Sequence, residues 1–200
     1  MGIICMVMGT VLLVGALSLF CYNRMEAAQA EKAVLEVLPQ IIERIPEMSE
    51  EEKLVQMTIP LEMLEPEELA MTEVMVDDEA YIGYLSIPGL GLDLPVMAEW
   101  DYERLKKAPC RYSGNIREDN LVLMAHNYEK HFGKISELRA GDSIYFSDMD
   151  GMVTTYEVVG RDVLSAVSVE EMTSGHFDLT LFTCDYSGKN RVTVYCDRAE

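Results

Sequence analysis

The sequence predicts an all-β domain that follows an apolar segment and an acidic segment. Within residues 80–200, many short runs rich in apolar and β-branched residues are separated by turn residues, and one short stretch has a helical pattern. Many short strands with few helices indicate a β-barrel or a β-sandwich. The 200 residues leave room for one ordinary domain with a packed core, plus some non-globular chain.

Residues 1–24 are predicted to be a membrane anchor. No charged side chain occurs from Met1 to Asn23, and the apolar run Ile3–Tyr22 is about as long as a helix needs to be to cross a hydrocarbon core. A cleaved signal peptide is the alternative, because Ala28-Gln29-Ala30 has the small residues of a cleavage site, but its apolar region would be longer than usual. We therefore expect a single uncleaved transmembrane helix.

Residues 25–79 are predicted to be an acidic stalk that holds the domain away from the membrane. The formal net charge of the chain is −19, and residues 26–79 carry 16 acidic but only 3 basic side chains. Glu26–Leu38 favours a helix until Pro39 interrupts it. The rest has the composition of a solvated spacer, with a specific acidic binding segment as the alternative. The charge argues against general nucleic-acid binding, which needs clustered Lys and Arg.

The domain of residues 80–200 is predicted to begin with a β-hairpin. Its strands are Tyr81–Pro88 and Leu92–Met97, joined by a turn at Gly89–Gly91. A short helix at Trp100–Lys107 and a loop at Pro109–Asp119 follow. The remaining strands are expected at Asn120–Ala125, Ser143–Phe146, Val153–Val163, Leu179–Thr183 and Val192–Cys196.

The last two predicted strands bring a thiol and a cation close together. Leu179–Cys184 ends in a cysteine, and seven residues later Arg191 opens the next strand. A thiolate is a strong nucleophile, and a guanidinium beside it can stabilise that anion or the oxyanion formed when it attacks a carbonyl. Arg198 is the rival for this role, but Arg191 is nearer to Cys184 along the chain. The first hypothesis is therefore acyl transfer through a cysteine.

His126 is the preferred proton carrier. It follows the apolar run Leu121–Ala125, where a loop begins, so its imidazole is expected at the rim of the domain. A histidine at a strand end can also be purely structural, and only pairing with Cys184 favours a catalytic role. His131 and His176 are the fallback candidates.

Among the five cysteines, Cys184 is the preferred nucleophile. Cys196 is expected to pack within its strand, whereas Cys110, in a loop, is an open alternative. The cysteine spacing resembles neither a disulfide framework nor a zinc site, so we expect no metal and no cofactor. Glu170 and Glu171 are interpreted as solvated acids, with a calcium site as the alternative.

Several of these residues, in this order, resemble the sortase family of cysteine transpeptidases of Gram-positive cell surfaces. The matching elements are the opening strand Tyr81–Pro88, Ala125-His126-Asn127 followed by His131-Phe132-Gly133, the Thr-Leu-x-Thr-Cys signature at Thr180–Cys184, and Arg191. The resemblance covers about Tyr81–Arg198. Ala125 and Asn127 replace the glycine and arginine that flank the histidine in many sortases, which leaves the subclass and the preferred signal open.

This resemblance implies an eight-stranded β-barrel whose groove binds a sorting signal similar to Leu-Pro-x-Thr-Gly on a secreted protein. It implies that Cys184 attacks the Thr carbonyl to form a thioacyl enzyme. It also implies that His126 protonates the leaving amine and deprotonates the incoming one, and that Arg191 stabilises the oxyanion. Thr183, beside the nucleophile, is expected to contact substrate or oxyanion. An amine of peptidoglycan or of a pilin subunit would complete the transfer.

The predicted protein is thus a single-pass enzyme of the cell membrane with its catalytic domain outside the cell. Two alternatives remain open. One is an anchored cysteine peptidase that hydrolyses the acyl enzyme with water, and the other is an inactive β-barrel binding module that retains the motif. A transpeptidase and a hydrolase need the same thiol, base and oxyanion donors, so the residues alone do not separate them.

Overall fold

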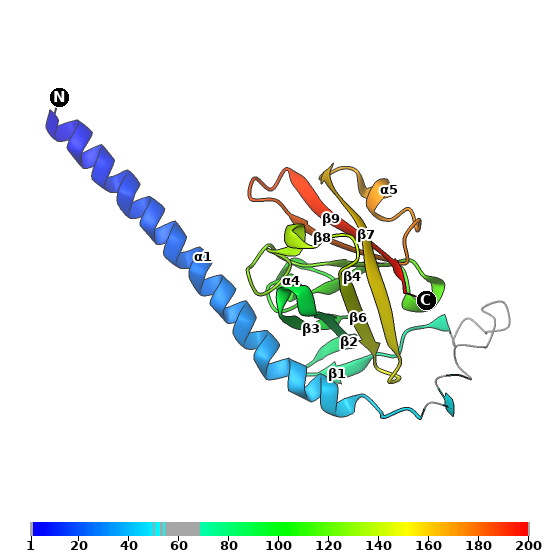
Figure 1. Ribbon diagram of the computed structural model, residues 1–200. Coiled ribbons are helices and arrows are strands. Elements are labelled where there is room, and N and C mark those ends of the chain that lie inside the picture. Colours follow the sequence, from blue (N-terminus) through cyan, green and yellow to red (C-terminus); the bar gives the residue numbers. More distant parts are fainter. Residues whose placement is uncertain (1, 50, 53, 55–68, 200) are drawn as a thin grey trace.

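A long helix lies against a β-barrel and projects beyond it (Figure 1). The computed structural model describes residues 2–49, 51–52, 54 and 69–199. The helix is α1 (Gly2–Arg44). Its most apolar 18-residue stretch has a mean hydropathy of 2.5, and none of that stretch is buried by the rest of the chain. By length and composition α1 is able to cross a membrane.

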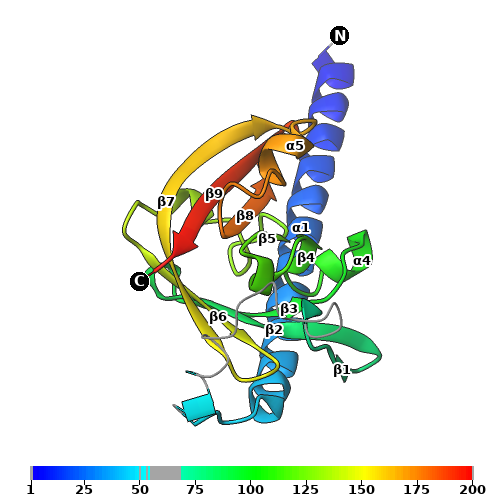
Figure 2. The ribbon, with the colours of Figure 1, turned by 90° about the vertical axis from the view of Figure 1, so that its right-hand side faces the viewer.

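Eight strands form a closed barrel, as the sequence predicts. The described residues contain nine strands, of which all but the first belong to the barrel. In chain order they are β1 (Val74–Val76), β2 (Glu79–Ile87), β3 (Leu92–Met97), β4 (Cys110–Ser113), β5 (Leu121–Met124), β6 (Ser143–Asp148), β7 (Val153–Ser165), β8 (Leu179–Cys184) and β9 (Asn190–Arg198). Around the barrel the order is β2-β3-β4-β5-β8-β9-β7-β6, and the pairing of β2 with β6 closes the ring. Figure 2 shows these strands curving around a common interior. β1 pairs with the start of β2, beyond the residues that pair with β6, and lies outside the ring.

The connections between strands contain only short helices. These are the α-helices α4 (Tyr102–Leu105) and α5 (Val169–Met172) and the 3-10 helices η2 (Pro88–Leu90), η3 (Ile116–Glu118) and η4 (Ile135–Glu137). Helix α4 is a shorter form of the helix predicted at Trp100–Lys107. It begins after Asp101, whose carboxylate accepts a hydrogen bond from the amide of Arg104 at 2.7 Å, and this N-cap satisfies a donor that the helix leaves free.

The barrel closes where β2 passes close to β6. Gly83 has a φ of +144°, and a Cβ atom there would lie 2.0 Å from the carbonyl oxygen of Ser147. The register of β2 against β3 shifts between Tyr81 and Gly83, as at a β-bulge. Only a glycine fits this approach, so Gly83 allows the sheet to close.

The two faces of β5 and β8 have different surroundings. Leu121, Leu123, Leu179 and Leu181 are fully buried in the main core inside the barrel. Because successive side chains of a strand point to opposite faces, the residues between them face outward. There a smaller cluster forms from Val122, Leu164, Met172 and Phe182, with Tyr112 and Met124 packed against it. This buried outer cluster borders the end of β8, where the candidate active site lies.

Helix α1 continues through Pro39, so the prediction that the helix ends there is wrong. Proline removes one intrahelical hydrogen bond, but residues on both sides of it are held by the barrel. Ala30, Val34 and Ile41 are buried, and α1 packs against β1, β2 and β3. Tertiary packing of one helix face therefore outweighs the local cost at Pro39.

Part of the predicted acidic stalk belongs to the folded domain. The boundary expected at residues 79 and 80 falls inside β2, and β1 lies wholly within the expected stalk. Residues 55–68 of the stalk lie outside the described residues. Strand β4 was also predicted as loop, because its four residues include the polar Arg111, Tyr112 and Ser113 and show no apolar alternation. Pairing with β5 makes it a strand.

Candidate active site

Cys184 ends strand β8 and lies directly opposite Arg191 of β9. The two strands are antiparallel and pair these two residues, and the amide of Asp185 donates to the carbonyl of Asn190 at 3.0 Å. That bond identifies Cys184 and Arg191 as a non-hydrogen-bonded pair, in which the Cα atoms are about 4.5 Å apart and side chains are closest. The thiol and the cation that are seven residues apart in the sequence are thus directly paired across the two strands.

Cys184 lies on the outer face of β8, with Thr180 and Phe182. Phe182 belongs to the outer cluster, whereas Leu181 lies in the main core, so the alternation assigns Cys184 to the outside. The cysteine is half-buried. Its thiol therefore lies at the end of the strand face that carries the buried outer cluster.

His126 follows β5, the strand that runs parallel to β8. Met124 of β5 pairs with Phe182, and the amide of Ala125 donates to the carbonyl of Phe182 at 3.3 Å. His126 and Cys184 are each two residues further along, beyond this last pair. Met124 and Phe182 both pack in the outer cluster and Ala125 packs in the main core, so the alternation up to Ala125 favours an outward His126, on the same side as Cys184.

The loop that carries His126 is tightly closed by its own backbone. The carbonyl of Tyr128 accepts hydrogen bonds from the amides of His131 (3.0 Å) and Gly133 (2.9 Å), and the carbonyl of His126 accepts one from Phe132 (3.1 Å). A Cβ atom on Gly133 would lie 2.6 Å from the carbonyl oxygen of Asn127 and 2.7 Å from that of Tyr128. The loop geometry therefore requires a glycine at this position, and it holds the His126 backbone in place.

Burial lowers the pKa of His126 below its usual value, because the protein interior disfavours the charged imidazolium. The carboxylate of Glu26, on α1, raises this pKa, and the ammonium of Lys106 lowers it. The imidazole also packs against the ring of Tyr128, with ring centres 4.9 Å apart. The proton affinity of His126 is thus set by burial and by charges on two helices.

Arg191 is held over the turn that joins β8 to β9. Its Nη1 donates to the carbonyls of Gly188 (3.2 Å) and Asn190 (3.1 Å). It forms no ion pair with any residue that the structure describes, so its charge is not neutralised by a neighbouring carboxylate. The guanidinium has five N–H donors in a planar fork, and its remaining donors are available to a developing oxyanion.

Thr183 points to the opposite face from Cys184. Its side chain is buried, and its hydroxyl donates to the carbonyl of Ala125 at 2.8 Å. This bond fastens the end of β8 to the end of β5, next to His126. The geometry favours a role in holding the two strand ends together over the predicted contact with substrate.

The structure separates the other candidate histidines and Arg198 from Cys184. His131 is fully buried, and this burial lowers its pKa to about 4. His176 is exposed and precedes β8, at the end of that strand farthest from Cys184. Arg198 ends β9, seven residues from Arg191, and hydrogen-bonds to the carbonyl of Ile116 at 3.0 Å.

The two remaining barrel cysteines are packed in the protein interior. Cys110 and Cys196 have no exposed surface. Burial raises the pKa of Cys110 to about 12 and also raises the pKa of Cys196. Both thiols therefore stay protonated at neutral pH and are poor nucleophiles, which removes Cys110 as an alternative to Cys184.

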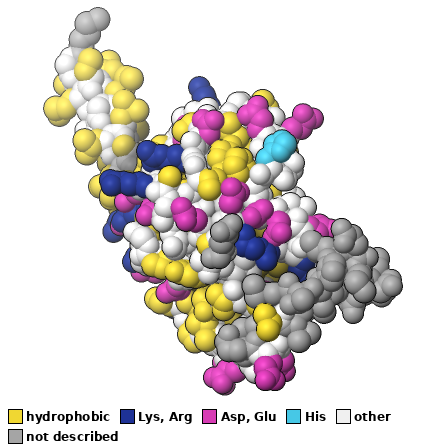
Figure 3. Space-filling view, turned by 45° about the vertical axis from the view of Figure 1, so that its right-hand side comes forward, with side chains coloured by type: hydrophobic (Ala, Val, Ile, Leu, Met, Phe, Trp, Pro, Cys, Tyr) yellow, Lys and Arg dark blue, Asp and Glu magenta, His cyan; other side chains and the backbone are white. Residues whose placement is uncertain are grey.

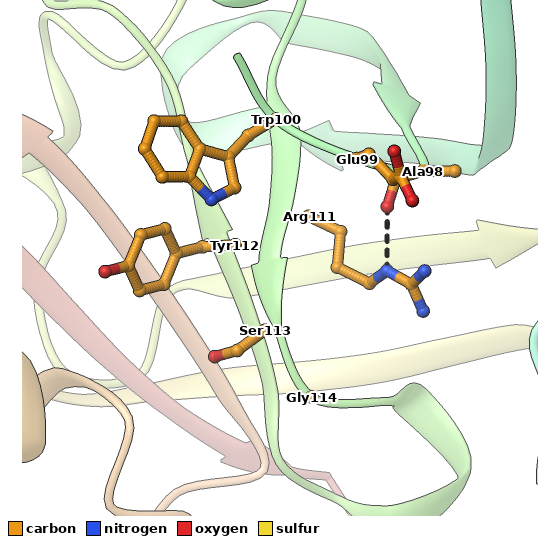
Figure 4. Close-up of a pocket in the computed structure, with 7 residues that line it drawn as sticks. All are labelled: Ala98, Glu99, Trp100, Arg111, Tyr112, Ser113 and Gly114. Atoms are coloured by element: carbon orange, nitrogen blue, oxygen red, sulfur yellow. Dashed lines mark hydrogen bonds between the residues drawn. The ribbon is translucent and has the colours of Figure 1, made fainter.

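An aromatic pocket that the sequence analysis missed lies beside the outer cluster (Figure 4). Its volume is about 410 Å³, and it is lined by Ala98, Glu99, Trp100, Arg111, Tyr112, Ser113 and Gly114. Trp100 stacks on Tyr112 with ring centres 5.5 Å apart, and Tyr112 meets the edge of Phe182 at 5.2 Å. The pocket is thus connected to the strand that carries Cys184. The sequence feature that could have indicated this pocket is Trp100, the only tryptophan of the chain, which is 40% exposed.

Within the described residues, no group of three or more histidine, cysteine, aspartate or glutamate side chains is arranged to hold a metal ion. The side chains at the candidate site supply three kinds of chemical group. They are a thiol, an imidazole and a guanidinium at adjoining ends of β5, β8 and β9. This combination in a closed β-barrel is the arrangement expected of a cysteine-dependent acyl transferase.

Comparisons with known proteins agree with this class. The sortase domain model matches residues 85–199. Sortase A of Bacillus anthracis is 28% identical over 126 residues, which make up 60% of this chain and 60% of that protein. Sortase C1 of Streptococcus suis superimposes with a TM-score of 0.52 at 25% identity, covering 60% of this chain and 73% of that one. Sortase C of Clostridium perfringens has a TM-score of 0.60 at 23% identity, covering 83% and 99% of the two chains, and this likeness concerns the fold.

The chain belongs to the sortase family, because the family model matches more than half of its residues. It spans 60% of the length of the Bacillus anthracis relative that it matches.

Proposed function

We propose that this chain is a cysteine transpeptidase that acts through Cys184, His126 and Arg191. The observation that carries the proposal is the strand register. Cys184 is paired with Arg191 across an antiparallel ladder, and His126 and Cys184 each lie two residues beyond a paired residue of the parallel strands β5 and β8. This register supports a nucleophile, a proton carrier and an oxyanion donor at adjoining strand ends.

The proposed reaction passes through a thioacyl enzyme. The thiolate of Cys184, whose proton is held by His126 as the imidazolium, attacks the carbonyl carbon of the scissile peptide bond, and the guanidinium of Arg191 stabilises the resulting oxyanion. The carbon–nitrogen bond breaks as His126 gives a proton to the leaving amine. An incoming amine then attacks the thioester and loses its proton to His126, and the thiolate of Cys184 leaves.

We propose a sorting signal similar to Leu-Pro-x-Thr-Gly on a secreted protein as the acyl donor, and an amine of peptidoglycan or of a pilin subunit as the acceptor. Membership of the sortase family supports this substrate class. The sortase C of Clostridium perfringens was solved with a C-terminal cell wall sorting motif.

We further propose that α1 anchors the protein as a single-pass membrane protein whose barrel lies outside the cell. The part of α1 that projects from the barrel is covered mainly by hydrophobic side chains, and Lys and Arg side chains gather where the helix meets the barrel (Figure 3). Basic side chains beside the end of an apolar helix are suited to anionic lipid headgroups. An outward-facing barrel would meet secreted substrates as they leave the membrane.

The test is to incubate the full chain in detergent micelles with a Leu-Pro-x-Thr-Gly peptide, with and without a peptidyl amine, and to identify the products. Transpeptidation predicts that the amine diverts the acyl group into a new amide. Hydrolysis that no amine diverts would identify a cysteine peptidase instead. Binding of the peptide with no cleavage would identify an inactive binding module. Cys184→Ala is the control, and turnover that survives in it would exclude the mechanism.

A further inference from the structure

One face of α1 packs against the barrel, and Glu26 lies on that face. The buried residues Ala30 and Val34 are four positions apart, and Ile41 is seven further on, the spacing of a single helical stripe. Glu26 precedes Ala30 by four residues and is half-buried, while its neighbours Arg24 and Met25 are exposed. The helix therefore directs the Glu26 carboxylate toward the domain.

At this point α1 borders the loop that carries His126. Glu31 of α1 forms an ion pair with Lys130 of that loop at 3.9 Å, and Val34 packs in the same core cluster as Phe132. Figure 1 shows the loop after β5 reaching toward the helix. The loop is rigid because of its own backbone hydrogen bonds, so a contact with α1 is transmitted to His126.

The Glu26 carboxylate is oriented on the helix and faces two aromatic rings of the site. The hydroxyl of Tyr22, one helical turn earlier, donates to its Oε1 at 2.8 Å. The carboxylate is near enough to raise the pKa values of both Tyr128 and His126, and these two rings pack together. The cation that opposes this effect on the pKa of His126 is Lys106, which directly follows α4. Its ammonium is paired with Glu103 at 2.7 Å.

We propose that Glu26, supplied by the membrane-anchoring helix, is a positioning residue for the catalytic histidine. This inference rests on the proposed function of His126. Burial disfavours the imidazolium that must protonate the leaving amine, and the Glu26 carboxylate offsets part of that cost. The chain thereby makes the acid–base step depend on the docking of α1, so a barrel released from its helix is a weaker enzyme.

The other groups that act on His126 define what else contributes to its titration. Burial and the ammonium of Lys106, which follows α4, both lower its pKa. The other titratable or charged side chains of the surrounding elements are Tyr22 on α1, Tyr128 and His131 on its own loop, Cys184 at the end of β8 and Arg191 on β9. Among the charged groups that shift the pKa of His126, Glu26 is the anionic one. Removing its charge therefore has a defined sign: the pKa of His126 falls.

The experiment measures the titration of His126 directly. The three histidines of the full chain, in detergent micelles and with Cys184→Ala to silence the thiol, are followed by NMR of ring-labelled histidine, and each signal is assigned by substitution. Glu26→Gln is expected to lower the midpoint of His126 by at least about half a pH unit. Glu26→Asp restores part of the shift. Glu36→Gln, on the exposed side of the same helix, leaves it unchanged.

A kinetic measurement on the enzyme with Cys184 intact accompanies this titration. In Glu26→Gln the limb of the kcat/KM profile that reports His126 moves to lower pH, while Glu36→Gln matches the parent. An unchanged His126 midpoint in Glu26→Gln, or an equal shift in Glu36→Gln, overturns the inference. If no substrate is turned over but the midpoint still shifts, the proposed function fails and the electrostatic influence of Glu26 on His126 stands.

Discussion

At the scale of single residues, the site depends on which side of a strand each side chain faces. Cys184 and Thr183 are adjacent in sequence, yet Cys184 lies on the outer face while the Thr183 hydroxyl bonds inward to Ala125. Arg191 and Arg198 are both on β9, yet only Arg191 is paired with Cys184. Strand alternation and register therefore assign different roles to residues of the same type.

Arg191→Ala is expected to lower kcat/KM by about 100- to 1,000-fold, because it removes the oxyanion donor. Arg198→Ala should leave kcat/KM near the parent value and lower the stability of the fold instead, since Arg198 pairs with Asp119 and with the carbonyl of Ile116. Steady-state kinetics and urea unfolding of both variants separate these outcomes. A greater loss of activity in Arg198→Ala would show that the arginine is wrongly assigned.

Thr183→Val should lower the free energy of unfolding by about 1 kcal/mol, because it removes the hydrogen bond to Ala125 while keeping the shape of the side chain. Thr183→Ser retains the hydroxyl and should restore most of this loss. Urea unfolding of the unliganded proteins is the measurement. A direct role in substrate binding predicts unchanged stability and a raised KM, which is the opposite pattern.

At the scale of elements, the loop after β5 and helix α1 together determine where His126 lies. The loop is closed around the Tyr128 carbonyl, and this closure needs the small Gly133. Helix α1 adds the ion pair from Glu31 to Lys130. The imidazole is thus placed by one rigid loop and one docked helix.

Gly133→Ala is expected to reduce kcat/KM by about 10- to 100-fold, because the new Cβ forces backbone carbonyls of the loop to move and displaces His126. Gly160→Ala is the matched control, since a Cβ at Gly160 on β7 meets nothing within 4 Å. Activity is compared at equal folded fraction, measured by circular dichroism. Equal activity in the two alanine variants would contradict the role given to this loop.

Some elements were open to prediction from sequence and others were not. The strand ending at Cys184 and the following Arg191 were identifiable, because alternation and a short connection bring them together. The end of α1 was not, because the burial of Ile41 beyond Pro39 depends on β1 to β3. Likewise, Glu26 falls within the predicted solvated stalk, since no local pattern reveals that a helix face will meet a loop a hundred residues away.

At the scale of the whole molecule, a buried histidine makes stability depend on pH. Burial lowers the pKa of His131 from 6.5 to about 4, so between these values the unfolded chain binds a proton that the folded chain does not. Stability therefore rises with pH through this window. The contribution is fully present above pH 6.5 and is lost as the pH falls to about 4.

His131→Phe should abolish this part of the acid sensitivity, which amounts to roughly 3 kcal/mol across the window. The exposed His176→Asn should behave like the parent. The free energy of unfolding of each full chain, measured at several pH values in detergent, tests the effect. A parent and a His131→Phe variant with the same slope between pH 6.5 and 4 would contradict it.

At this scale, one continuous helix, α1, carries both the apolar stretch that is able to cross a membrane and the face that docks on the barrel. Ala30, Val34 and Ile41 hold the second half of α1 on β1 to β3, and the apolar half continues the same helix. We therefore expect the orientation of the barrel, and of its site, to be fixed relative to the membrane.

The most direct test of the central claim is mass spectrometry of the full chain after brief incubation with a Leu-Pro-x-Thr-Gly peptide and no amine acceptor. The account predicts a mass increase equal to the acyl part of the peptide, located on Cys184 and lost when an amine is added. It also predicts no adduct in Cys184→Ala and a much slower one in His126→Ala. An adduct on Cys110 or Cys196, or cleavage of the peptide with Cys184 absent, would contradict the account.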